Sequence, residues 1–74
     1  MSKLLESGLY RHFKGRNYRV VDTAIHSETL EDLVVYCADY GDDRRLWVRP
    51  LKMFTGLIKN AEGQWVKRFE RIGD

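Results

Sequence analysis

The chain has 74 residues, a hydrophobic content of 43%, a single cysteine and a formal net charge of +2. This length provides one domain with a small core, and the hydrophobic content excludes a disordered chain. One cysteine excludes an intramolecular disulfide, and no apolar run approaches the roughly 18 residues that a membrane-spanning helix requires. We therefore expect a soluble, cytoplasmic protein without a signal peptide and without membrane contact.

The charged residues are distributed unevenly along the chain. Residues 1–21 carry five basic and one acidic side chain, residues 22–43 carry seven acidic and no basic ones, and residues 44–74 carry eight basic and three acidic ones. The simpler explanation is that acidic and basic surfaces pair within the fold. The alternative is a basic face that binds a polyanion.

The first predicted strand covers residues 8–13. Alternation along it places Tyr10 and His12 on the same face. Residues 14–17 then form a turn, because glycine and asparagine both accept positive φ. Both ends of the chain are expected to be loose, at residues 1–7 and 73–74.

The second predicted strand covers residues 18–26. Its apolar alternation changes phase after Val20, which predicts a β-bulge or a sharp bend of the kind that turns corners in small barrels. The strand pattern breaks at residues 26–32. Serine and threonine there are good N-cap residues, so we expect one short helical turn that points Leu30 and Leu33 inward.

The central predicted strand covers residues 33–39, and we expect the core to be built on it. Apolar side chains occur at both odd and even positions, which is typical of a strand buried on both faces. Cys37 lies within this strand. It is expected to be buried and unreactive, since no basic, exposed setting surrounds it. A turn at residues 40–43 follows.

The chain returns as a fourth strand near residues 45–50, ended by the only proline. Within it, Leu46 and Val48 are expected to face the core. Trp47 and Arg49 would then project together from the opposite face.

A single tight turn at residues 51–54 is expected to bury Leu51 or Met53. A second hairpin follows, with strands near residues 54–59 and 64–71. The total is five or six short strands with at most single helical turns. This pattern predicts an all-β domain, folded as a small barrel or a rolled sheet.

The sequence offers weak candidates for catalysis or metal binding. His26 and Ser27 are adjacent, so on a strand their side chains would point to opposite faces, and Ser27 is better explained as a cap. Two histidines and one cysteine lack the spacing of a zinc site, and no glycine-rich phosphate loop is present. We therefore expect no enzymatic activity, no metal and no cofactor.

Trp47 and Arg49 are stronger candidates for ligand binding. On one exposed strand face they could stack on a base or aromatic ligand, or hold a phosphate or carboxylate. The structural alternative, which we favour, is an ion pair between Glu28 and Arg49 that Trp47 shields from water.

Two groups of candidate site residues follow from these patterns. The ligand-binding candidates are Tyr10, His12, His26, Ser27, Glu28, Tyr36, Trp47 and Arg49. The run from Tyr10 to Arg19 interleaves basic and aromatic residues as single-strand binders do. It supplies the nucleic-acid candidates Arg11, Lys14 and Arg16.

The chain resembles a bacterial family known as domain of unknown function 1653 (DUF-1653). The resemblance is carried by four blocks, Gly8-Leu9-Tyr10-Arg11-His12-Phe13-Lys14-Gly15, His26-Ser27-Glu28-Thr29-Leu30-Glu31, Leu33-Val34-Val35-Tyr36, and Leu46-Trp47-Val48-Arg49-Pro50-Leu51 with Met53-Phe54. It implies an SH3-like small barrel and no assigned reaction. Cys37 departs from the polar or basic residue expected after the Val-Val-Tyr run, which makes it a poor candidate for a shared function.

We therefore expect a non-catalytic, SH3-like binding or accessory module that contacts a polyanion or nucleic acid. One alternative is a barrel that recognises a peptide or protein through grooves lined by aromatic side chains. A less favoured alternative is a small enzyme or sugar-binding accessory that uses the His26 and Glu28 region. The protein is expected to be a monomer or a weak dimer.

Overall fold

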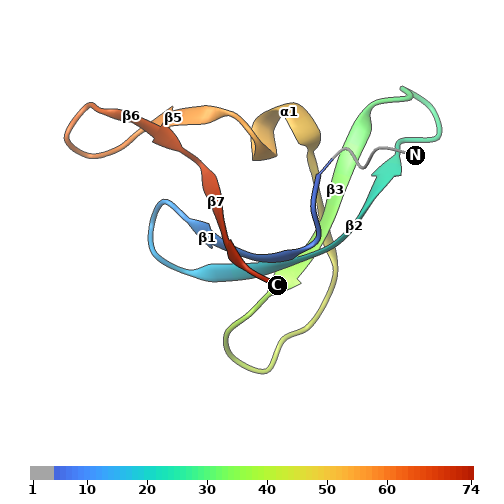
Figure 1. Ribbon diagram of the computed structural model, residues 1–74. Coiled ribbons are helices and arrows are strands. Elements are labelled where there is room, and N and C mark those ends of the chain that lie inside the picture. The colour runs from blue at the N-terminus through green and yellow to red at the C-terminus, as the bar shows by residue number, and fades with distance from the viewer. Residues whose placement is uncertain (1–4) are drawn as a thin grey trace.

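The computed structural model describes residues 5–74 and consists almost entirely of β-strands (Figure 1). The strands are β1 (Gly8–His12), β2 (Asn17–Ile25), β3 (Asp32–Ala38), β4 (Trp47–Pro50), β5 (Leu57–Lys59), β6 (Trp65–Lys67) and β7 (Phe69–Gly73). A single helical turn, α1 (Leu51–Phe54), follows β4. The predicted all-β class is confirmed. No helix within the described residues is long and apolar enough to cross a membrane.

The strands form two antiparallel sheets. The larger has five strands in the order β4-β3-β2-β1-β7, and β5 and β6 form a separate pair. Figure 1 shows the β5–β6 hairpin projecting away from the curved five-stranded sheet. The single last strand expected at residues 64–71 is wrong. The chain changes sheets at Arg68, whose backbone N–H donates to Gly56 and whose carbonyl accepts from Phe13.

The central position of β3 is confirmed, because β3 pairs with β2 on one side and with β4 on the other. The predicted irregularity in β2 is also confirmed. Val20 lies opposite Tyr36 and Asp22 lies opposite Val35, so Val21 is an extra residue in the ladder. A bulge of this kind bends a strand and increases its twist. It lets β2 follow the curvature of the sheet.

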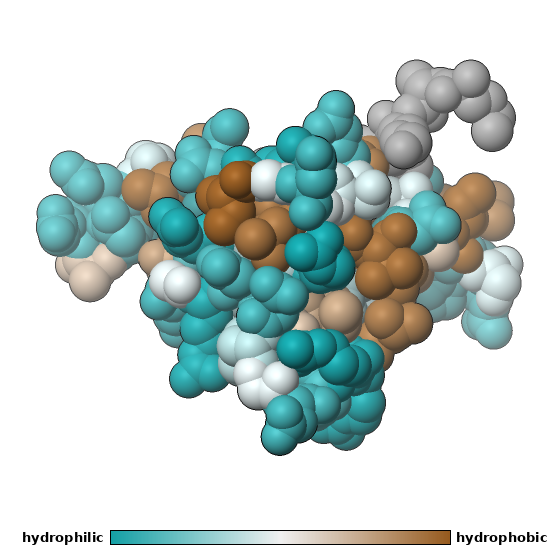
Figure 2. Space-filling view, turned by 60° about the horizontal axis from the view of Figure 1, so that its bottom comes forward, coloured by the Kyte–Doolittle hydropathy of each residue, from teal (hydrophilic) through white to brown (hydrophobic). Residues whose placement is uncertain are grey.

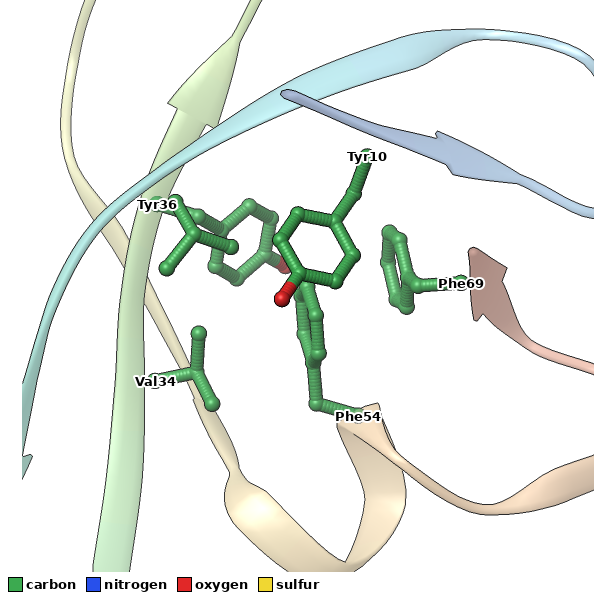
Figure 3. Close-up of a cluster of buried hydrophobic side chains, with 6 residues drawn as sticks. Tyr10, Val34, Tyr36, Phe54 and Phe69 are labelled. Atoms are coloured by element: carbon green, nitrogen blue, oxygen red, sulfur yellow. The ribbon is translucent and has the colours of Figure 1, made fainter. Parts of the chain in front are cut away.

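The core is small and mainly aromatic (Figure 3). Its buried side chains come from five elements and are Tyr10, Val20, Val34, Tyr36, Phe54 and Phe69. Figure 3 shows Phe54 reaching from α1 between the rings that β1, β3 and β7 contribute. The single turn at residues 51–54 forms as expected, but it buries Phe54, with Leu51 packed beside it. Met53 is exposed.

The side chains of β4 face the opposite way from our expectation. Trp47 lies opposite Tyr36 and Arg49 opposite Val34 in the ladder. Directly paired residues share a face, and both β3 residues are buried, so Trp47 and Arg49 lie on the core side. Val48 faces outward and is 60% exposed. From the side shown in Figure 2, apolar residues, in brown, are likewise exposed between hydrophilic ones.

The segment at residues 26–31 is a hairpin loop that contains the predicted short turn. The backbone N–H of His26 donates to Glu31, and that of Leu30 donates to the His26 carbonyl four residues earlier, which closes one helical turn. The predicted direction of the two leucines is wrong. Leu30 has φ 62° and is 73% exposed. Leu33 is half-buried on the outer face, because alternation with the buried Val34 directs it there. Neither leucine points into the core.

The expectation of loose ends does not hold for residues 5–7 or for Gly73. Leu5 packs against the core, and the Ser7 carbonyl accepts a hydrogen bond from Arg71. Gly73 belongs to β7 and lies opposite Leu9. Residues 1–4 lie outside the described part of the chain. Cys37, expected in the core, is half-buried on the outer face, because β3 directs its even-numbered residues inward.

Candidate binding pocket

A pocket opens where β3 and β4 enter their connecting loop. It encloses about 360 Å³ and is lined by Tyr18, Tyr36, Ala38, Tyr40, Gly41, Asp42, Asp43 and Trp47. Sheet register explains why the residues from the strands meet. Tyr18 lies opposite Ala38 and Tyr36 opposite Trp47, all on the core side of the sheet. The pocket therefore continues the aromatic core toward solvent.

Tyr18 is at the centre of the aromatic wall. Its ring meets those of Tyr36 and Tyr40 edge to face, with centroids 5.7 Å apart in both pairs. The Tyr18 and Tyr40 hydroxyls share a hydrogen bond of 3.4 Å. This bond raises the pKa of Tyr18, whereas the same bond, together with Arg16, lowers the pKa of Tyr40. Edge-to-face contacts of this kind fix the ring orientations and preform the wall.

Two arginines pack against rings of the pocket without lining it. The Arg16 guanidinium lies 4.6 Å from the centroid of Tyr40, and that of Arg45 lies 5.6 Å from that of Trp47. The charged groups that do line the pocket are carboxylates. Asp43 is paired with Arg45 at 2.8 Å, and this hydrogen bonding lowers the pKa of Asp43. Asp42 forms no ion pair with any residue from 5 to 74.

Of the predicted ligand-binding residues, Tyr36 and Trp47 line the pocket. Arg49 lies next to it and is half-buried. Its Nε donates to the Tyr36 hydroxyl at 3.3 Å, and its guanidinium lies 5.7 Å from the centroid of Phe69. Tyr10 is committed to the core, where its hydroxyl donates to the Glu6 carbonyl at 2.7 Å.

The cluster His26, Ser27 and Glu28 lies at the opposite end of β3, in the β2–β3 loop. The His26 Nδ1 accepts hydrogen bonds from the backbone N–H groups of Glu28 and Thr29, so this imidazole organises the loop. The proposed Glu28–Arg49 ion pair does not form. Arg49 turns toward the core side, and its hydrogen-bond partners are Tyr36 and Met53.

His12 is half-buried on the core side. Its ring centroid lies 4.8 Å from that of Phe69 and 6.1 Å from that of Tyr18. The imidazole therefore packs against Tyr18, which lines the pocket, without lining the pocket itself. The Nδ1 atom accepts a hydrogen bond from the Lys14 backbone. Burial lowers the pKa of His12, and the charges of Arg49, Arg68 and Lys14 lower it further.

The predicted nucleic-acid residues do not converge at the pocket. Arg11 is exposed and lines a separate cleft beside β6. Lys14 is in the β1–β2 turn, where its ammonium lies 5.9 Å from the Phe13 ring centroid. Arg16 packs on Tyr40 from outside the pocket lining. Three basic residues that are close in sequence therefore face three different surroundings.

The sequence-based interpretation missed six lining residues: Tyr18, Ala38, Tyr40, Gly41, Asp42 and Asp43. The signal for Tyr18 was present, because it is two residues before the inward-facing Val20. Tyr40 was assigned only to a turn. Placing it against Tyr18 requires the β2–β3 register, which the pattern of one strand cannot supply.

No three histidine, cysteine, aspartate or glutamate side chains within residues 5–74 are grouped so that they could hold a metal ion. What the pocket offers chemically is ring faces, ring edges and carboxylate oxygens. These groups bind cations and hydrogen-bond donors.

Comparisons with known proteins support the fold. A family model described as "Protein of unknown function (DUF1653)" matches residues 8–71. A crystal structure of a protein belonging to the same family from Bordetella bronchiseptica is similar, with a TM-score of 0.82 and 30% sequence identity. The similarity covers 93% of this chain and 88% of that chain. No curated protein matches the sequence.

Proposed function

Because the chain belongs to the DUF1653 family of proteins of unknown function, its relatives assign no ligand, and we propose from the pocket that it is a non-catalytic protein-recognition module. The pocket takes a cationic side chain, arginine or lysine, presented by a partner protein. The remainder of the partner segment lies along the sheet beside the pocket, where β3 and β4 enter their connecting loop. This proposal corresponds to the peptide-recognition alternative rather than to the polyanion hypothesis.

The observation that carries the proposal is the lining itself, in which four aromatic rings surround a space that two carboxylates border. A cation placed over an aromatic ring gains about 0.5–2 kcal/mol, depending on how far it is desolvated. Arg16 and Arg45 already pack on two of these rings from positions outside the lining. These contacts with guanidinium groups of the same chain support arginine as the ligand side chain.

The carboxylates favour a cation over an anion. Asp42 has no basic partner among residues 5–74, so a ligand cation can neutralise it. A phosphate in the same place would meet the Asp42 carboxylate, which has no such partner, and the Asp43 carboxylate, which Arg45 pairs. The nearby arginines lessen the attraction for a cation, so we expect the specificity to come from ring contacts and geometry more than from long-range charge.

A pair of model peptides tests this proposal. Acetyl-Gly-Arg-Gly-amide carries the cation, and acetyl-Gly-citrulline-Gly-amide has the same shape without the charge. NMR titration of the nitrogen-15-labelled protein should show saturable shifts of the backbone N–H signals of Gly41 and Asp42, which line the pocket, with the arginine peptide. The citrulline peptide should produce much smaller shifts.

The matched variants are Trp47→Leu and Trp65→Leu, since both tryptophans are exposed but only Trp47 lines the pocket. Only Trp47→Leu should remove the arginine-dependent shifts. Equal binding of the two peptides, or shifts that survive Trp47→Leu, would refute the cation pocket.

A further inference from the structure

The β5–β6 hairpin presents an exposed face that the pocket does not use. Paired residues share a face, and Leu57 lies opposite Lys67 while Lys59 lies opposite Trp65. All four side chains are exposed, with Trp65 at 63% and Leu57 at 59%. The other face, which carries Ile58 and Val66, is half-buried against the body of the protein.

The exposed face combines an aromatic platform with basic groups. The Lys59 ammonium lies 5.3 Å from the centroid of the Trp65 ring. Lys67 follows Trp65 on the same face, and no strand residue of the hairpin is acidic. A tryptophan in this position adds nothing to the core. The ring is 63% exposed beside two lysines and is therefore accessible to a ligand.

A cleft extends this surface toward β1. It encloses about 470 Å³, and its lining includes Arg11, Phe13, Asn60, Val66, Lys67 and Glu70. Lys67 thus belongs both to the exposed face and to the cleft. A basic track leads from Lys59 past Trp65 and Lys67 to Arg11, with Glu70 as the acidic group inside the cleft.

We propose that this track, which we call the hairpin surface, binds single-stranded nucleic acid. A base stacks on Trp65, the ammonium groups of Lys59 and Lys67 contact the flanking phosphates, and the strand continues into the cleft toward Arg11. Base stacking on an exposed aromatic side chain combined with a basic groove is how sequence-tolerant single-strand binders work. The hairpin surface is separate from the pocket, so this inference does not depend on the cation proposal.

Charge and shape favour nucleic acid over a lipid surface. The hairpin lies in the part of the sequence that carries eight basic and three acidic side chains. Only Leu57 and Trp65 offer exposed apolar groups on its outer face. The adjoining cleft contains polar groups such as Asn60 and Glu70. The hydrocarbon of a bilayer would leave these groups without hydrogen-bond partners, whereas a nucleotide can form hydrogen bonds with them.

The test is the fluorescence anisotropy of labelled oligothymidine, measured with the intact protein between about 50 mM and about 200 mM salt. Binding should be saturable at the lower concentration. The logarithm of the association constant should fall linearly with that of the salt concentration, by about 0.7 for each phosphate contact. Trp65→Ala should weaken binding roughly tenfold, because one stacked base is lost. Trp65→Phe should retain most of the affinity.

Lys67→Gln should reduce the salt slope by about 0.7, whereas Lys52→Gln should leave it unchanged. Lys52 is the matched control, since it is an exposed lysine on α1. Circular dichroism of each variant verifies folding. The proposal is overturned if oligothymidine does not bind, or if Trp65→Ala binds as the unchanged protein does. It is also overturned if Lys52→Gln matches Lys67→Gln, or if anionic phosphatidylglycerol vesicles bind while oligothymidine does not.

Discussion

The rings of Phe54 and Phe69 lie parallel to each other, with centroids 4.0 Å apart and an interplanar angle of 3°. Phe54 is on α1, directly after β4, and Phe69 begins β7. The strands β4 and β7 are the two edge strands of the five-stranded sheet. The stack, with Arg49 from β4 beside Phe69, therefore joins the sheet edges through side chains and not through a backbone ladder.

Phe54→Ala should lower the free energy of unfolding by about 3–5 kcal/mol, because it removes the ring at the centre of a small core. A domain of this size has little stability to spare, so the variant should be largely unfolded at 37 °C. Urea denaturation followed by circular dichroism measures the loss. Lys52→Ala, on the exposed side of the same turn, should change stability by less than about 0.5 kcal/mol. Equal effects of the two substitutions would contradict the role of the stack.

Gly8 allows a close approach between the two ends of the described chain. Its φ is +128°, and a Cβ there would lie 2.6 Å from the carbonyl oxygen of Gly73. Gly15 is a matched control, because its φ is +104° but a Cβ would meet nothing within 4 Å. Gly15→Ala should cost about 1 kcal/mol from backbone strain alone. Gly8→Ala should cost at least about 1 kcal/mol more in chemical denaturation, since backbone must also move.

Arg49→Ala should lower the free energy of unfolding by about 1–2 kcal/mol, because it leaves the buried Tyr36 hydroxyl without its donor. A double-mutant cycle with Tyr36→Phe separates this contact from other effects. We expect a coupling energy of about 0.5–1 kcal/mol between the two side chains. Strictly additive losses would show that the contact contributes nothing.

Stability should fall as the pH drops below the ordinary imidazole pKa of 6.5, because the pKa of His12 is lowered in the folded state. Between the folded-state pKa and 6.5, the unfolded chain binds the proton and the folded protein does not. The contribution of His12 to the free energy of unfolding is therefore fully present above pH 6.5 and is lost as the pH falls through this window. Urea midpoints measured across this range should show the decline.

His12→Asn should flatten that pH dependence, because asparagine can still accept the Lys14 hydrogen bond but does not titrate. The unchanged protein is the reference for this slope. A slope in His12→Asn equal to that of the unchanged protein would assign the pH dependence to other groups.

Much of the fold could be predicted from the sequence because strand alternation is a local signal. The bulge after Val20 appears directly as a change of phase. Which side chains of β4 face the core could not be predicted, since the odd-numbered and the even-numbered residues of this strand both include apolar ones. Only pairing with Val34 and Tyr36 decides that Arg49 and Trp47 lie on the core side of the sheet. The change of sheets at Arg68 depends on hydrogen bonds to Phe13 and Gly56, and residues this distant along the chain leave no local pattern.

The same limit applies to the candidate pocket. Tyr36 and Trp47 could be identified as candidates because large aromatic residues on strands are few. Tyr40 and Asp42 could not, since their place depends on how the β3–β4 loop folds over Tyr18. Conversely, the polar cluster with His26 and Glu28 was predicted to bind a ligand. In the structure, the Nδ1 of His26 accepts backbone hydrogen bonds that shape the loop.

The most direct test of the cation pocket is the measurement of intermolecular nuclear Overhauser effects between acetyl-Gly-Arg-Gly-amide and the labelled protein. The account predicts contacts from the arginine side-chain methylene protons to the ring protons of Tyr18, Tyr40 and Trp47. Contacts to the exposed Trp65 instead, or no contacts at saturating peptide, would contradict it.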